Sequence, residues 1–206
     1  MKKLFILSAC LMIITCAQAQ FNFNPKIGVN FSKITSDDIA LSEEGVKAGF
    51  NVGVDFRAFG SDSRVFFQPG IHYYNVGSQF RVSSTEDDAV DTDLDDIVNV
   101  HSLKVPLNAG VYLTNLDNPV HVRLNGGVTP SFVLGAGENN LNISADDFKK
   151  LYWGLNGGVG FDFSFITLDF NYSHGLSSIL DSVERINANN VNGRERSLTI
   201  SVGALF

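Results

Sequence analysis

A serine and a histidine stand side by side at Ser173 and His174, and a second serine follows at Ser177. A serine becomes a nucleophile when a nearby base accepts its proton, so this group could mark a hydrolase site at the rim of a β-structure. Neighbouring residues of a strand point to opposite faces, however, and the sequence places no acidic residue to orient the histidine. We therefore expect no catalytic residues and no enzymatic activity, and a rim hydrolase is the least favoured function.

An acidic segment at residues 86–96 could bind a hard cation, because carboxylates at alternate positions are suitable ligands for Ca²⁺. The turn glycine and the distal glutamate of an EF-hand loop are absent. The pattern favours a solvated external loop over a metal site. The acidic residues are Glu86, Asp87, Asp88, Asp91, Asp93, Asp95 and Asp96.

The histidines are spread over separate segments of the chain, and a metal site would need several of them to converge. We expect hydrogen-bonded roles for them instead, and no metal or cofactor. Both cysteines, Cys10 and Cys16, lie in the N-terminal apolar segment, so a disulfide or thiolate site in the remainder is excluded. The histidines are His72, His101, His121 and His174.

The N-terminus has the pattern of an export signal. Lys2 and Lys3 precede an apolar stretch from Leu4 to Cys16, and the small-residue site Ala17-Gln18-Ala19 follows. We expect residues 1–19 to be a cleaved signal peptide and residues 20–206 to form one domain. A lipoprotein cleavage box at Leu7–Cys10 is the alternative, and it is disfavoured because residues 11–16 would then be left exposed.

The composition predicts a β-rich protein with little surface in water. Only 18% of residues are charged, compared with about 25% in typical soluble domains, while glycine (19) and phenylalanine (17) are abundant. Removing Lys2 and Lys3 lowers the formal net charge from -7 to -9, which argues against nucleic acid as a partner. No later stretch has the length of apolar sequence that a membrane helix needs, so membrane insertion would require a closed barrel.

Apolar and polar residues alternate with period two in eight segments, which is typical of strands with two different faces. From Ile166 to Ser173 the apolar and polar side chains alternate without a break, and the last segment continues the pattern to Phe206. The other six segments begin near residues 27, 50, 65, 103, 120 and 153. We predict an all-β fold, an eight-stranded antiparallel up-and-down transmembrane β-barrel.

Long and short connections alternate between these segments. The long ones lie near residues 35–45, 83–97, 136–150 and 177–193, and the short ones near 60–63, 114–119 and 164–165. This is the pattern of outer-membrane barrels, which have short periplasmic turns and long external loops. Both termini should therefore lie on the periplasmic side. A capping-box pattern from Ser144 to Asp147 predicts one helical turn within a loop.

Alternation alone does not distinguish a membrane barrel from a soluble barrel of the lipocalin kind. The polar face consists mostly of Gly, Asn, Ser and Thr, which suits a narrow lumen filled with side chains and argues against a diffusion pore. A few charges of nearly balanced sign should also point inward, as a buried network requires. These are Lys26, Arg57, Lys104 and Arg123 with Asp55, Asp162 and Asp169.

Aromatic residues near the strand ends predict girdles at the two membrane interfaces, although aromatics favour any strand. On the periplasmic side we expect Phe59, Phe66 and Phe206, and on the outer side Phe132, Tyr152, Trp153 and Tyr172.

Several short motifs, taken in order, resemble the PorT-like outer-membrane β-barrel family of Gram-negative bacteria. The resemblance covers essentially the whole chain after the signal, and a terminal aromatic such as Phe206 is similar to the signal that directs barrels to outer-membrane assembly. It implies an eight-stranded barrel in the outer membrane without assigned enzymatic activity. The motifs are residues 25–32, 67–74, 104–107, 157–160 and 171–176.

From these observations we expect an outer-membrane protein with a structural or interaction role through its external loops. Its expected partners are outer-membrane lipid and envelope proteins, and we expect a monomer. An accessory component of an envelope secretion assembly is the alternative, because some relatives in the resembled family take part in protein secretion.

Overall fold

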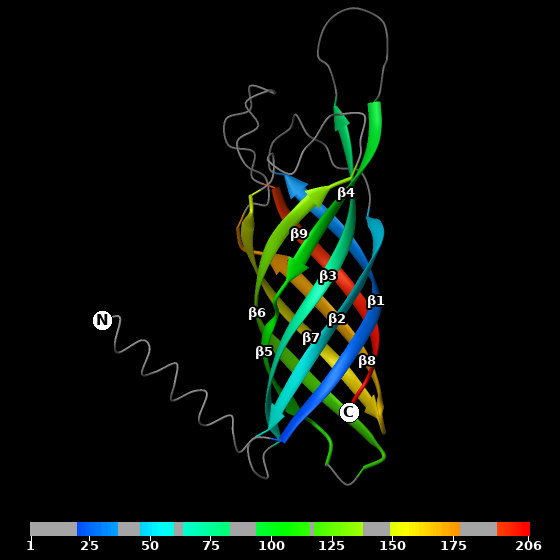
Figure 1. Cartoon of the computed structure of the whole chain (residues 1–206), viewed down its shortest axis with the longest axis vertical. Coiled ribbons are helices and arrows are strands. Elements are labelled where there is room, and N and C mark those ends of the chain that lie inside the picture. The colour runs from blue at the N-terminus through cyan, green and yellow to red at the C-terminus, as the bar shows by residue number, and fades with distance from the viewer. Residues whose placement is uncertain are drawn as a thin grey trace, which may run out of the picture.

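In the part of the chain that the computed structural model describes, nine strands form a single sheet (Figure 1). The structure describes residues 20–36, 46–59, 64–82, 94–115, 118–137, 149–177 and 193–206. The strands are β1 (Gln20–Ser36), β2 (Lys47–Phe59), β3 (Val65–Val82), β4 (Leu94–Lys104), β5 (Leu107–Tyr112), β6 (Val120–Ala136), β7 (Leu151–Phe163), β8 (Ile166–Gly175) and β9 (Gly193–Ala204).

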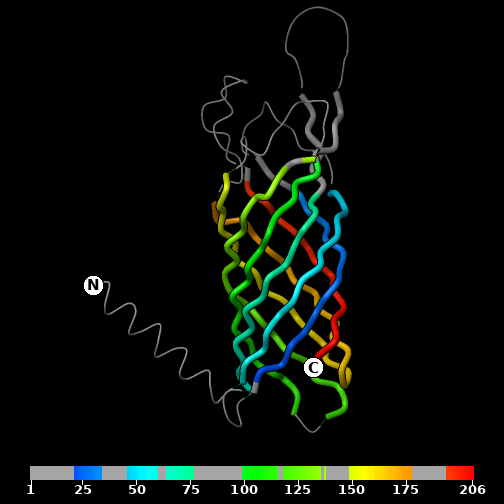
Figure 2. Tube along the Cα trace, in the orientation of Figure 1, coloured from blue at the N-terminus to red at the C-terminus, as the bar shows by residue number. Residues whose placement is uncertain are grey.

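The sheet closes into a barrel because β1 and β9, the first and last strands, pair with each other. All pairings are antiparallel, and Ile27 of β1 lies opposite Val202 of β9. Reciprocal backbone hydrogen bonds of 2.9 and 2.8 Å between Phe23 and Phe206 extend this closure to the C-terminal residue. The strands tilt around the barrel axis (Figure 2).

Strands β4 and β5 are two segments of one barrel strand. Both pair with β3 on one side and with β6 on the other. They are separated at Val105 and Pro106, because a proline has no N–H to donate to the ladder. The chain nevertheless stays in the sheet, since Val105 N donates to Pro130 O and Gly70 N donates to Pro106 O, each at 2.9 Å. The prediction of eight antiparallel strands in a barrel is confirmed.

The apolar half of each strand faces outward. On β9, Leu198 and Val202 are 44% and 48% exposed, while Thr199 and Ser201 between them are buried. The buried side chains are largely polar throughout, and the exposed ones include most of the large hydrophobic residues. A soluble barrel would have the reverse arrangement, so the lipocalin-like alternative is wrong.

The connections follow the predicted alternation. Both the first described residue, Gln20, and the C-terminus lie at the end where the short connections join the strands (Figure 1). The tightest of these is the two-residue turn of Ser164 and Phe165, in which Ser164 adopts a φ of 57°. Left-handed backbone at such a turn matches the right-handed twist of the flanking strands.

One predicted connection is shorter than expected. The spacing of the alternating segments predicts a long connection at residues 83–97, but β4 begins at Leu94, and Leu94 pairs with Val82. Backbone pairing with β3 satisfies the hydrogen bonds of residues 94–97, so the hairpin continues beyond the predicted boundary.

Three expectations lie outside the described residues: the signal at 1–19, the capping box from Ser144 to Asp147, and acidic residues 86–93. No helix in the described part of the chain is long and apolar enough to cross a membrane.

Candidate functional site

The serine and histidine of the hydrolase hypothesis lie on opposite faces of β8. Ser173 lines a cavity inside the barrel, whereas His174 follows the outward parity of Tyr172, which is 49% exposed. Ser177 lies beyond the strand, where its Oγ accepts a hydrogen bond of 2.8 Å from Trp153 N. The arrangement does not give either serine a histidine base.

The histidines are likewise dispersed. His72 is buried in the lumen, while the Nδ1 of His101 lies 2.7 Å from the Tyr73 hydroxyl, with the two rings stacked. Among the residues that the structure describes, no group of three His, Cys, Asp or Glu side chains could hold a metal ion.

Buried charged side chains lie in the lumen of the barrel, where Asp162 forms ion pairs with two arginines. Arg57 Nη1 donates to Asp162 Oδ2 at 2.6 Å, and Arg123 Nε donates to Asp162 Oδ1 at 2.9 Å. The Tyr112 hydroxyl donates to the same Oδ2 at 2.8 Å. All four side chains are buried, so the ion pairs span the barrel out of contact with solvent.

A second set of ion pairs centres on Lys26. Its Nζ lies 2.6 Å from Asp55 Oδ2 and 2.6 Å from Asp169 Oδ2. Asp55 also contacts His72 Nε2 at 2.7 Å and accepts a hydrogen bond of 2.9 Å from Gln68 Nε2.

The two sets are joined into one network. Asp169 links them because its other oxygen lies 2.6 Å from Arg123 Nη2. Gln68 makes a second link, since its Oε1 accepts a hydrogen bond of 3.0 Å from Arg57 Nε. The network therefore joins side chains of β1, β2, β3, β5, β6, β7 and β8.

A separate bridge crosses the lumen nearer the long connections. Lys104 Nζ donates to Glu195 Oε1 at 2.5 Å, and the Tyr152 hydroxyl donates to Glu195 Oε2 at 2.8 Å. The Lys104 ammonium also lies 4.6 Å from the ring centroid of Tyr74.

The prediction of seven inward charges is confirmed, and Glu195 is the residue that it missed. Glu195 has the same parity as Thr199 and Ser201, so extending the alternation of the last strand toward its start would have found it. With Glu195 included, the side chains whose burial the structure describes comprise four buried cations and four buried carboxylates: Lys26, Arg57, Lys104 and Arg123 with Asp55, Asp162, Asp169 and Glu195. These eight charges balance when His72 is neutral, as burial of charges requires.

Between the network and the bridge lies a polar cavity of about 60 Å³. On β3 it is lined by Gln68, His72 and Tyr74, and on β9 by Ser197, Thr199 and Ser201. Polar walls and this volume suit a few water molecules.

Aromatic side chains fill the lumen at the end with the short connections, which corrects the predicted girdle. Phe66 is 2% exposed, and its ring packs against Phe59 and Tyr112 with centroids 6.1 and 5.3 Å away. At the other end Tyr152 is also buried. The error has a simple cause: Phe66 precedes Phe67 and Tyr152 precedes Trp153, and only one member of each adjacent pair can face outward.

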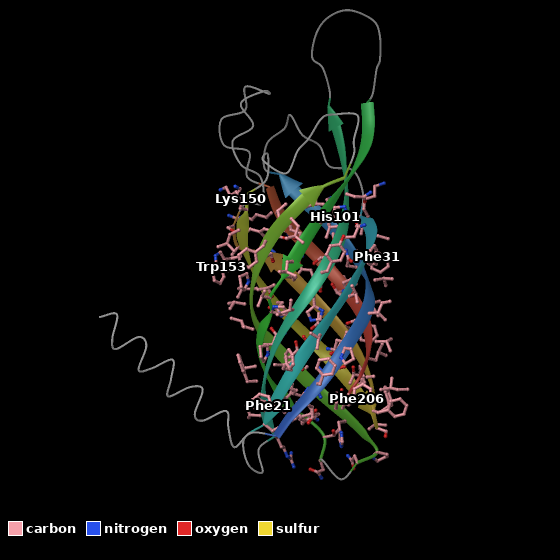
Figure 3. The ribbon with its side chains drawn as sticks, viewed as in Figure 1. Phe21, Phe31, His101, Lys150, Trp153 and Phe206 are labelled. Carbon is pink, nitrogen blue, oxygen red and sulfur yellow. The ribbon has the colours of Figure 1, made fainter. Side chains whose placement is uncertain are left out.

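Aromatic side chains on the outer wall of the barrel form two groups. Figure 3 shows Phe21 and Phe206 toward one end, and Phe31 and Trp153 toward the other. Of the predicted girdle residues, four are exposed on the outer wall: Phe132, Trp153, Tyr172 and Phe206. Amphipathic and aromatic rings at these two levels are typical of membrane interfaces.

A family model described as an outer membrane protein beta-barrel domain matches residues 16–181 of this chain. The chain belongs to this family. The match covers most of the barrel, and it agrees with the lipid-facing apolar wall and the closed antiparallel sheet. The protein is therefore an outer-membrane β-barrel.

Solved structures of outer-membrane proteins have the same fold. OprG from Pseudomonas aeruginosa aligns with a TM-score of 0.55 at 14% identity, covering 91% of this chain and 97% of that one. Neisserial surface protein A aligns with a TM-score of 0.51 at 13% identity, covering 91% and 99%. At these identities the likeness concerns the fold alone. A search of the curated proteins finds no match to this chain.

Proposed function

We propose that this outer-membrane barrel is a non-catalytic protein that displays its four long connections outside the membrane as an interaction surface. The observation that carries the proposal is the closed lumen. An eight-stranded barrel has an interior just wide enough for side chains, and here Arg57, Tyr112 and Asp162 cross it in direct hydrogen-bond contact. A barrel closed in this way is suited to anchoring its loops rather than to passing solutes.

The absence of catalytic function is part of the same proposal. It is supported by the placement of Ser173 inside the barrel and His174 outside. A serine nucleophile needs a base within hydrogen-bond reach, and opposite faces of a strand do not provide one.

Membership of the PorT-like subgroup, a monomeric state and envelope protein partners also belong to the proposal. The subgroup is supported by the short motifs in their order along the chain. The monomer is supported by the continuous closure of the sheet, which leaves no unpaired strand edge among the residues that the structure describes.

Planar-bilayer conductance tests the closed lumen. The wild-type protein should show little conductance, whereas a variant combining Arg57→Ala with Tyr112→Ala should conduct measurably because it removes the side chains that cross the lumen. Asn115→Ala, outside the network, is the matched control. Measurable conductance of the wild type, as large as that of the double variant, would contradict a closed lumen.

Loop exchange tests the interaction surface. Each long connection is replaced by a Gly/Ser linker of equal length, and binding of envelope proteins is measured by crosslinking on intact cells. Loss of a crosslinked partner with one exchange, and its retention when residues 60–63 are exchanged, is the expected result. A partner that survives all four exchanges would refute the proposal.

A further inference from the structure

Three neighbouring strands carry basic side chains at one level of the outer wall. Lys33 of β1 lies directly opposite Arg196 of β9, and Arg196 lies directly opposite His174 of β8. We refer to Lys33, Arg196 and His174 as the outer basic row. Arg194, two residues before Arg196 and near the start of β9, adds another exposed cation on the same side.

An apolar row lies two residues closer to the middle of the barrel on the same strands. Phe31 pairs with Leu198, and Leu198 pairs with Tyr172. These side chains are 38%, 44% and 49% exposed, so they belong to the lipid-facing wall. The wall therefore changes from apolar to basic within two residues along each strand, at the end that carries the long connections.

Among the side chains that the structure describes, no carboxylate lies beside these cations on the wall. Each of the four acidic side chains whose burial the structure describes points into the lumen: Asp55, Asp162, Asp169 and Glu195. Like charges directly opposite each other in an antiparallel pair destabilise a sheet, which applies to Lys33 and Arg196. An anion bound between them would remove this repulsion.

Directly opposite residues have Cβ atoms about 5 Å apart, so the three side chains of the row can reach one anionic group. Arginine and lysine bind phosphate oxygens through charge-assisted hydrogen bonds. The apolar row below would meet the acyl chains of a lipid whose phosphate lies at the basic row. Figure 3 shows the aromatic residues Phe31 and Trp153 toward this end of the barrel.

We propose that Lys33, Arg194 and Arg196, with His174, form a binding site for the phosphate of a phosphorylated glycolipid in the outer leaflet, whose acyl chains lie along Phe31, Leu198 and Tyr172. The site is on the barrel wall and is independent of the proposed role of the loops. It rests on the orientation of the barrel, with the long connections outside.

Native mass spectrometry of the detergent-purified protein tests the site with two probes, diphosphoryl lipid A and the same lipid with both phosphates removed. The wild type should bind the diphosphoryl form more tightly. In a variant carrying Lys33→Gln, Arg194→Gln and Arg196→Gln, that affinity should fall by about tenfold or more, given the contribution of each cation near an anionic headgroup. A heat-dependent shift on gels verifies that each variant is folded.

Arg64→Gln is the matched control, because Arg64 is exposed near the opposite end of the barrel, where it donates to Asn115. It should leave the affinity for both probes unchanged. Equal affinity of the wild type and the triple variant for diphosphoryl lipid A would overturn the site. Displacement of the lipid by an equimolar amount of inorganic phosphate would overturn the assignment to a lipid.

Discussion

Arg57 and Asp162 are 105 residues apart in the sequence and are joined by an ion pair of 2.6 Å inside the barrel. Asp162 also forms an ion pair with Arg123, so one carboxylate contacts arginines from two other strands. The stability of the barrel should depend on this residue more than on any single residue of its wall.

Replacing Asp162 by asparagine should lower the free energy of unfolding by about 3–5 kcal/mol, because Arg57 is left charged and buried without a carboxylate. Arg123 keeps its contact with Asp169. Urea unfolding followed by the fluorescence of Trp153, the single tryptophan, measures the effect. Adding Arg57→Met should recover most of the loss, and failure to recover it would argue against charge imbalance as the cause.

The bridge between Lys104 and Glu195 should behave in the same way. Glu195→Gln leaves Lys104 buried with a charge, so we expect a loss of about 3 kcal/mol. The pair Lys104→Met with Glu195→Leu should restore stability to within about 1 kcal/mol of the wild type, since apolar replacement of a buried ion pair is often neutral. A double variant as unstable as Glu195→Gln alone would show that the bridge has a further role.

A glycine in β7 leaves space for the network. A Cβ at Gly160 would lie 2.3 Å from the guanidinium carbon of Arg123, which two aspartates hold in place. Gly160→Ala should therefore cost about 1–3 kcal/mol through displacement of Arg123. Gly157→Ala in the same strand is the control, because its nearest neighbour would be Asn125 O at 3.7 Å, and the unfolding free energy should hardly change. Equal effects of the two substitutions would contradict this explanation.

The position of the lipid-facing wall in the membrane can be tested by placing arginine at two different depths. Ile27 lies near the middle of β1 and is 66% exposed, whereas Phe21 lies near its periplasmic end. Ile27→Arg should cost about 2–4 kcal/mol when the protein folds into lipid vesicles, and Phe21→Arg about 0–1 kcal/mol. Substitutions of equal cost would mean that these positions do not span the bilayer as described.

The amino-acid sequence by itself determined the strands, their two faces and the polar character of the lumen. Alternation is a local property: once Thr167 and Asp169 are assigned to one face, the neighbours on the same strand follow from the period of two. The inward charges could be predicted for the same reason. The long and short connections could be predicted from the spacing between the alternating segments.

Only the tertiary structure decided which inward residues meet. The partners of Asp162 come from β2, β5 and β6, and their heights in the barrel depend on strand register and on closure between β1 and β9. Register is set by pairing between distant segments, which a local pattern does not contain. The match of Lys104 with Glu195 and the alignment of Lys33 with Arg196 both depend on it.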